Sequence, residues 1–217
     1  MADVQPDAAA LRAQLQHVLW IGGASAAGKT TIARRIAEQN GLMLYATDDA
    51  MSDHARRATP ETCPFLSEFM EMDMDERWLR RSPEAMLETF PWFRGEAFDM
   101  IFDDVLRLPR TPGVIVEGFR LLPHRVQPLL AAPSHAVWLL PTPDFRRAAS
   151  AQRAPAWGFL DETSDPEQAL RNLLERDRMF TDRLREETTR LELPAIEVDV
   201  PTNEGEIANR VTEAFGL

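Results

Sequence analysis

Short apolar runs alternate along the chain with longer segments in which apolar residues recur every three or four positions. A short apolar run is typical of a buried strand, and the longer period is typical of an amphipathic helix. Their alternation predicts parallel βαβ units and an α/β fold with three layers, in which helices flank a five-stranded parallel sheet. The predicted strands are residues 18–21, 43–46, 114–116, 136–140 and 195–200.

Residues at helix boundaries predict where the helices lie. The first helix is expected from the Lys29-Thr30 step to Asn40, because Gly41 supplies a C-terminal stop. Residues 53–108 carry no strand pattern and predict a helical insertion of two or three helices, which covers a ligand cleft or simply packs on the sheet. The last helix of the insertion is expected over residues 83–108, and later helical regions over residues 145–190 and after Asn203, ending at Gly216.

Composition narrows the class of protein. With 217 residues and 44% apolar content, the chain is expected to fold as a single domain, residues 1–217. Its net charge of −11 argues against a main role in gripping nucleic acid or an anionic membrane. The lone Cys63 fits a reducing compartment, and neither a secretory signal nor an unbroken membrane span is recognisable. We therefore expect a cytoplasmic protein, a monomer or homodimer, with no nucleic-acid or membrane partner.

The string GASAAGKTT matches the pattern G-x-x-x-x-G-K-[ST], and it follows a predicted strand and precedes a predicted helix. Two glycines permit torsions that turn successive N–H groups inward, and the helix adds its positive dipole end. Lys29 is expected to bridge the outer phosphates of a nucleotide, while Thr30 offers its hydroxyl to magnesium. A chance glycine turn is the alternative. The predicted phosphate-binding residues are Gly23, Ala24, Ser25, Ala26, Ala27, Gly28, Lys29, Thr30 and Thr31.

Acidic residues follow the second and third predicted strands. Asp48 and Asp49 stand at a strand's carboxyl end, where open α/β sheets hold their ligands. A carboxylate there could take a proton from an attacking hydroxyl or hold magnesium through water, and we expect one Asp to act and the other to cap the next helix. Glu117 directly follows the third strand and is expected to organise the metal, the alternative being an exposed strand-end carboxylate.

Arginines follow the fourth predicted strand in a segment, residues 142–165, that is expected to form a lid. A mobile arginine could stabilise the charge that spreads over a transferring phosphoryl group. Arg153 is predicted to do so, and Arg146 and Arg147 to contact the nucleotide, with surface solvation as the alternative. Arg176 and Arg178 in the later helix are further candidates, for which pairing with neighbouring acids is the leading interpretation.

An acceptor with polar or anionic groups would be met by residues near the acidic pair. We predict Asp49, His54 and Arg57 for this role, together with Arg120 behind the third strand. Solvation on a helix surface, or pairing with a surface acid, is the alternative. Aromatic residues in the insertion are expected to be core: Trp78, Trp92, Phe93 and Phe98.

The loop, the acids and the arginine segment together resemble the small-molecule and nucleoside kinases of the P-loop superfamily, which include uridine kinase, shikimate kinase and chloramphenicol phosphotransferase. The resemblance is sharp in GASAAGKTT and weaker in YATDDAM and VIVEGF. It implies a P-loop NTPase fold of the nucleoside-monophosphate-kinase type, with ATP and Mg²⁺ as cofactors. It also implies an Asp base at the end of the second strand: the uridine kinase pattern favours Asp48, and the antibiotic kinase pattern favours Asp49. The insertion at residues 53–108 departs from the shortest members.

The expected function is therefore an ATP- and Mg²⁺-dependent phosphotransferase that moves the γ-phosphoryl group to a hydroxyl of a small molecule. The acceptor is a nucleoside, a sugar, a shikimate-like metabolite or an antibiotic. A nucleotide-binding switch or regulatory P-loop ATPase is the alternative, although the chain has no N-K-x-D string of the kind that confers GTP specificity.

Overall fold

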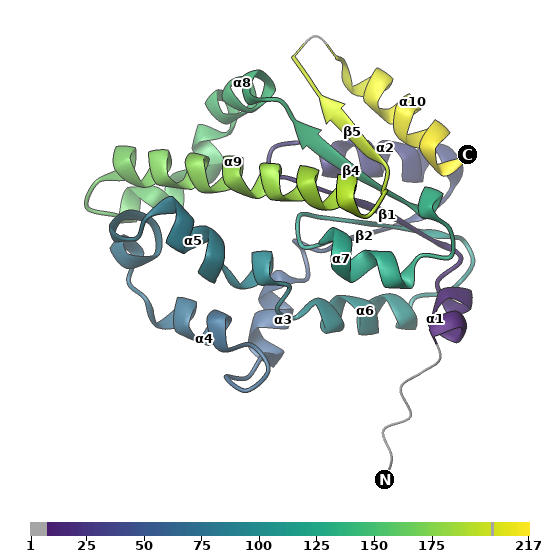
Figure 1. The fold of residues 1–217 in the computed structure, drawn as a ribbon, viewed down its shortest axis with the longest axis horizontal. Helices are drawn as coiled ribbons and strands as arrows, with labels where there is room; N and C mark the ends of the chain where they lie inside the picture. The colour runs from purple at the N-terminus through teal and green to yellow at the C-terminus, as the bar shows by residue number, and fades with distance from the viewer. Residues whose placement is uncertain (1–7, 201) are drawn as a thin grey trace.

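The computed structural model describes the backbone of residues 8–200 and 202–217, and the side chains of these residues apart from 8 and 150–157. A five-stranded parallel sheet in the order β2-β3-β1-β4-β5 crosses the molecule (Figure 1). The α/β class and the five parallel strands are thus as predicted. The strand over residues 195–200 ends two residues early. The strands are β1 (Val18–Gly23), β2 (Met43–Ala46), β3 (Val114–Glu117), β4 (Ala136–Pro141) and β5 (Ala195–Val198).

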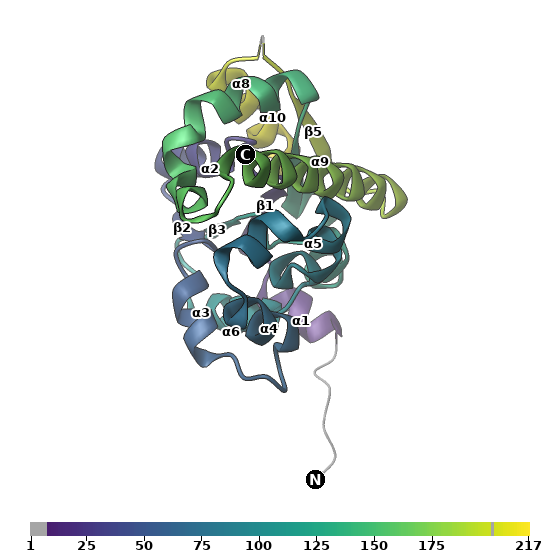
Figure 2. The same cartoon turned by 90° about the vertical axis from the view of Figure 1, so that its left-hand side faces the viewer.

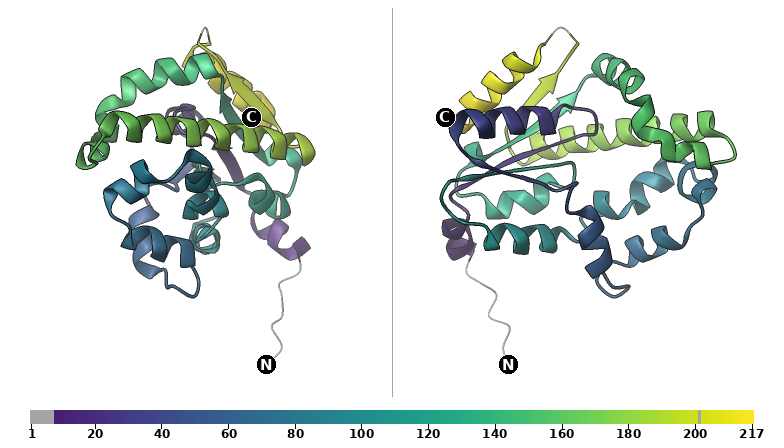
Figure 3. Two further views of the ribbon diagram at one scale, coloured as in Figure 1. Left: turned by 60° about the vertical axis from the view of Figure 1, so that its left-hand side comes forward. Right: turned by 180° about the vertical axis from the view of Figure 1, so that it is seen from behind.

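Helices cover both faces of the sheet because alternate strand residues point to opposite sides. On one face, Ile21 and Val137 pack with Ile32 of α2 (Lys29–Asn40) and with α10 (Glu204–Phe215). Figure 3 shows these two helices side by side when the molecule is seen from behind. On the other face, Trp20 and Trp138 belong to a larger core. That core is covered by α1 (Ala8–Gln14), α6 (Phe98–Arg107), α7 (Pro123–Val126) and α9 (Pro166–Arg190).

Residues between β2 and β3 form a helical block, and its helix α5 (Pro83–Thr89) packs against α9 (Figure 2). The single helix expected over residues 83–108 is wrong. Pro91 has no N–H to continue a helix, and Gly95 closes the following turn with a φ of 80°. Trp78 and Phe93 are buried in this block, as expected. Its elements are α3 (Met51–Arg57), α4 (Pro64–Glu71), a π-helical turn (Glu76–Arg80), α5 (Pro83–Thr89), a 3-10 turn (Pro91–Arg94) and α6.

The segment after β4 leads away from the sheet and back. It forms α8 (Pro143–Arg153) and a 3-10 segment (Ala154–Glu162), and α9 then returns across the sheet face. These elements agree with the helical regions predicted over residues 145–190. Across the described part of the chain, no helix combines the length and the apolar character that crossing a membrane requires.

The start of α10 offers a test of the local structure. The Asn203 side chain accepts a hydrogen bond from the Glu206 amide at 3.0 Å, and the Glu206 carboxylate accepts one from the Asn203 amide at 3.3 Å. Asn203→Ala should lower the free energy of unfolding by about 1 kcal/mol, or the melting temperature by about 2–4 °C. Asn203→Asp keeps the accepting oxygen and should melt close to the parent. Equal losses in both variants would contradict this role of the cap.

Candidate functional site

The loop of residues 23–31 runs from the carboxyl end of β1 into α2. Gly23 has a φ of 132°, and a Cβ there would lie 2.2 Å from the Leu139 carbonyl oxygen, so only glycine fits. The Ala24 amide donates to the same carbonyl at 3.2 Å and fixes the loop to β4. Ala26 and Gly28 are both left-handed, with φ values of 63° and 77°. Such backbone turns successive N–H groups toward one side, which is the arrangement that receives an anion.

The side chains that follow the loop converge on β3. The Lys29 ammonium donates to the Ala24 carbonyl at 2.8 Å, across the mouth of the loop. The Thr30 hydroxyl donates to Glu117 Oε1 at 2.8 Å, although 87 residues separate the two in the chain. Glu117 is only 1% exposed, which excludes an exposed strand-end carboxylate. Lys29, Thr30 and Glu117 are therefore neighbours at the carboxyl edge of the sheet.

The surroundings of Glu117 disfavour its ionised form. Burial raises the pKa of this carboxyl group, and the negative charges of Asp48 and Asp49 raise it further. The charge of Lys29 and the hydrogen bond from Thr30 act in the opposite direction without cancelling the rise. A cation placed beside Glu117 would favour its ionised form. The electrostatics of the site therefore favour binding of a positive charge.

The donor chemistry indicates what kind of cation fits. Within the described residues, no group of three or more His, Cys, Asp or Glu side chains is arranged to hold a metal ion. The Thr30 hydroxyl and the Glu117 carboxylate are hard oxygen ligands, which Mg²⁺ prefers, and Mg²⁺ commonly takes its remaining ligands from water and phosphate. These two oxygen donors therefore fit a magnesium ion that binds together with a polyphosphate. They fit a metal ion held by protein side chains alone less well.

The acidic pair follows β2 directly and is exposed to solvent. Thr47, fully buried, donates its amide to the Glu117 carbonyl at 2.9 Å, and its hydroxyl lies 3.4 Å from Asp48 Oδ1. The expectation that one of the two acids caps the next helix is wrong. Helix α3 begins after Ala50, and no side chain caps it. Both Asp48 and Asp49 thus keep exposed carboxylates beside Glu117.

Close packing behind the acidic pair requires a glycine and a buried arginine. A Cβ on Gly118 would lie 1.8 Å from Thr47 Oγ1, so no larger residue fits there. Arg120 lies over the Trp92 ring at 4.3 Å and donates to the carbonyls of Thr47 and Ala97 at 3.2 and 3.3 Å. Burial lowers the pKa of its guanidinium to about 10. Arg120 is thus a buried residue that links the segment after β2 to the helical block through hydrogen bonds. It is not a surface residue.

Asp104 on α6 organises a cluster that the sequence did not reveal, because no motif marks it. It accepts hydrogen bonds from the Tyr45 hydroxyl at 2.8 Å and from His54 Nε2 at 2.9 Å, and Arg57 lies 3.4 Å away. Burial alone would raise the pKa of Asp104, but these hydrogen bonds lower it overall. His54 is fully buried, and burial lowers its pKa. His54 is therefore not a solvated helix residue, whereas Arg57 remains partly exposed and also pairs with Asp53.

A small cavity of about 80 Å³ lies beside the loop. Arg176 in its wall donates to Asp177 Oδ1 at 2.7 and 3.1 Å and stacks over the Phe90 ring at 4.5 Å. Arg176 thus pairs with a neighbouring acid of its own helix, as the leading interpretation of the sequence predicted. The lining residues are Ser25 of the loop, Phe90, Phe93, Phe119, Arg176 and Asp177.

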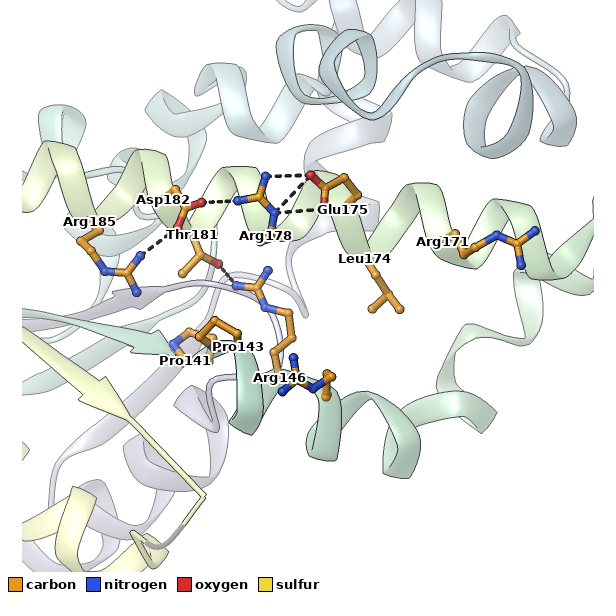
Figure 4. A pocket seen from close by; sticks show the side chains of 11 residues that line it. Pro141, Pro143, Arg146, Arg171, Leu174, Glu175, Arg178, Thr181, Asp182 and Arg185 are labelled. Carbon is orange, nitrogen blue, oxygen red and sulfur yellow. Dashed lines mark hydrogen bonds and ion pairs between the residues drawn. The ribbon is translucent and has the colours of Figure 1, made fainter.

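The predicted lid arginines lie on a different surface. Arg146 donates to the Thr181 hydroxyl, and Arg147 pairs with Asp144. Both line a cavity between α8 and α9 whose walls contain no residue of loop 23–31 (Figure 4). The side chain of Arg153 lies outside the described residues. Arg178 pairs with Glu175 and Asp182 on its own helix, as the leading interpretation predicted.

Neither a protein-family model nor a curated protein matches this chain. Its function is therefore inferred from the residues that meet at the carboxyl ends of β1, β2 and β3.

The raised pKa of Glu117 predicts how stability changes with pH. The folded protein holds the Glu117 proton more tightly than the unfolded chain, so the parent loses stability as the pH rises from the ordinary glutamate range through the folded pKa. Glu117→Gln keeps an oxygen that can accept from Thr30 but carries no charge. It should melt above the parent at about pH 8, and by a smaller margin at about pH 4. Thermal unfolding measures both, and a margin independent of pH would contradict this account.

Proposed function

We propose that this chain is an ATP- and Mg²⁺-dependent phosphotransferase that moves the γ-phosphoryl group to a hydroxyl of a small molecule. The hydrogen bond from Thr30 to Glu117 carries the proposal, because it joins the G-x-x-x-x-G-K-[ST] loop to a buried carboxylate on the neighbouring strand. The parallel sheet supports it, since such sheets bind ligands at the carboxyl ends of their strands. Both features agree with the resemblance to P-loop kinases of the nucleoside-monophosphate-kinase type.

In this proposal the loop and the first turn of α2 hold the phosphates. Backbone amides of residues 23–31 and the positive end of the helix dipole receive the phosphate oxygens. Lys29 exchanges the Ala24 carbonyl for a phosphate oxygen and neutralises charge on the outer phosphates. Thr30 and Glu117 would hold a magnesium ion, which would supply charge neutralisation for the phosphates.

The acceptor is activated on the β2 side of the loop. Asp48 or Asp49 takes the proton of the acceptor hydroxyl, because both carboxylates are exposed beside Glu117. Arg120 and His54 are buried and fix the wall behind this pair, while the partly exposed Arg57 meets polar groups of the acceptor. Arg153 is assigned to the transferring phosphoryl group. We propose a cytoplasmic protein with a small-molecule substrate.

Lys29 provides the direct test of the nucleotide site. Lys29→Ala should weaken ATP binding in the presence of Mg²⁺ by about ten- to a hundredfold, because it removes a charge-assisted hydrogen bond to phosphate. Arg34→Ala, an exposed change of the same charge on the same helix, is the matched control and should bind as the parent does. Calorimetric titration measures the affinities. Parent-like affinity in Lys29→Ala would refute this phosphate site.

Turnover tests the reaction and separates it from a switch or regulatory ATPase. The parent, ATP and Mg²⁺ are incubated with nucleosides, sugars, shikimate and aminoglycoside or phenicol antibiotics. At least one acceptor should raise ADP formation above the acceptor-free rate. ADP formation that no acceptor stimulates, but that a protein partner does, would favour the switch and contradict the phosphotransferase.

We expect one residue of the acidic pair to act as the general base and the other to have no role in proton transfer. Replacing the base by Asn should lower kcat by about a hundred- to ten-thousandfold while ATP affinity changes little, because only proton transfer is lost. The other Asp→Asn variant should retain most of its kcat. Steady-state kinetics on Asp48→Asn and Asp49→Asn decide between them, and near-parent kcat in both would exclude a base at this position.

A further inference from the structure

Five arginines gather around one cavity in a chain whose net charge is −11. The cavity measures about 300 Å³ and lies between α8 and α9, where Figure 4 shows the side chains of both helices facing it. Glu175 and Asp182 share its walls, and Asp144 and Glu167 pair with two of the arginines from beside it, so the arginines outnumber these four acids by one. The arginines are Arg146 and Arg147 from α8 and Arg171, Arg178 and Arg185 from α9.

Arg146 is the buried member of this group. Its side chain is directed toward α9, where Nη2 donates to the Thr181 hydroxyl (Figure 4). The residue is only 9% exposed, and its Nε and Nη1 are buried without a hydrogen-bond partner among the side chains and backbone that the structure describes. A buried cation with unsatisfied donors is costly unless an anion or another acceptor meets them. Burial accordingly lowers the pKa of this guanidinium.

The other arginines can meet a ligand without unfolding any element. Arg178 is half-exposed and is bonded to Glu175 and Asp182, while Arg171 is more exposed still. Guanidinium groups from two facing helices present paired N–H donors, which match the oxygens of a phosphate. Leu174, Pro141 and Pro143 add an apolar portion to the wall that would accommodate a small organic body.

We propose that the α8–α9 cavity is a second anion site, separate from loop 23–31, that takes a compact organic phosphate. None of its lining residues belongs to the loop, and Arg146 is directed toward Thr181. Arg146 and Arg147 then serve this site, in place of the nucleotide contacts expected from the sequence. A bound phosphate would bridge α8 and α9.

The experiment uses the full chain, with anion binding at the loop weakened by Lys29→Ala. Lys29→Ala is titrated calorimetrically with inorganic pyrophosphate and should retain one binding site. Adding Arg178→Ala to that chain should weaken binding by about tenfold, because one charge-assisted contact is lost. Arg183→Ala, a charge removal on another face of α9 where Arg183 pairs with Glu88, is the matched control and should change nothing. Because Arg178 is half-exposed, thermal unfolding should show that these chains fold.

A conservative change and a second probe sharpen the result. Arg146→Lys in the Lys29→Ala chain keeps the charge but removes the planar fork, and should also weaken pyrophosphate binding. Glycerol 3-phosphate should bind Lys29→Ala at least as tightly as inorganic phosphate if the apolar wall contacts an organic body. Weaker binding of glycerol 3-phosphate would contradict the assignment to organic phosphates.

Two outcomes would overturn the proposal. Lys29→Ala that binds no pyrophosphate would show that loop 23–31 is the only anion site, and equal losses in Arg178→Ala and Arg183→Ala would show a diffuse charge effect. Neither outcome contradicts the phosphotransferase proposal, because that proposal depends on Lys29 and on acceptor-dependent turnover. Conversely, Arg178-dependent pyrophosphate binding without such turnover would leave the second site standing and the phosphotransferase refuted.

Discussion

The hydrogen bond between Thr30 and Glu117 is the interaction on which the candidate site depends, because it joins the loop after β1 to the end of β3. Parallel pairing places these ends together: Ile21 and Ala46 both stand opposite Glu117 in the register of the sheet. Close packing then leaves little freedom. The Leu139 carbonyl allows only glycine at position 23, and Thr47 allows only glycine at position 118. The sheet thus sets the distance between loop and carboxylate before any ligand binds.

This arrangement of charges is electrostatically unfavourable in the protein alone. Glu117 is buried near two other carboxylates, its pKa is raised, and Ala26 adopts a left-handed backbone that a residue with a Cβ seldom takes. Strain and like charges of this kind cluster at sites that bind or react, where a partner relieves them. In the proposed function, Lys29 and a magnesium ion bring the missing positive charge, and the loop amides receive the anion that accompanies it.

The sequence predicted what local chemistry determines. Strand positions, the start of α2 at Lys29 and its end at Gly41 follow from patterns and caps, and the motif placed the loop correctly between strand and helix. Sequence patterns did not predict the features that tertiary packing determines. The helix over residues 83–108 is broken because Pro91 overrides its apolar period. The Asp104 cluster depends on contacts between distant elements, and the α8–α9 cavity depends on how one helix returns past another.

The central claim is that loop 23–31 and Glu117 together bind a nucleotide with magnesium, and calorimetric titration with ATP tests it most directly. The parent is titrated in Mg²⁺ and again in EDTA, beside Glu117→Gln under both conditions. The account predicts that removing Mg²⁺ weakens ATP binding to the parent by at least about tenfold, and that this difference largely disappears in Glu117→Gln. Equal ATP affinity of the parent with and without Mg²⁺, or no ATP binding at all, would contradict it.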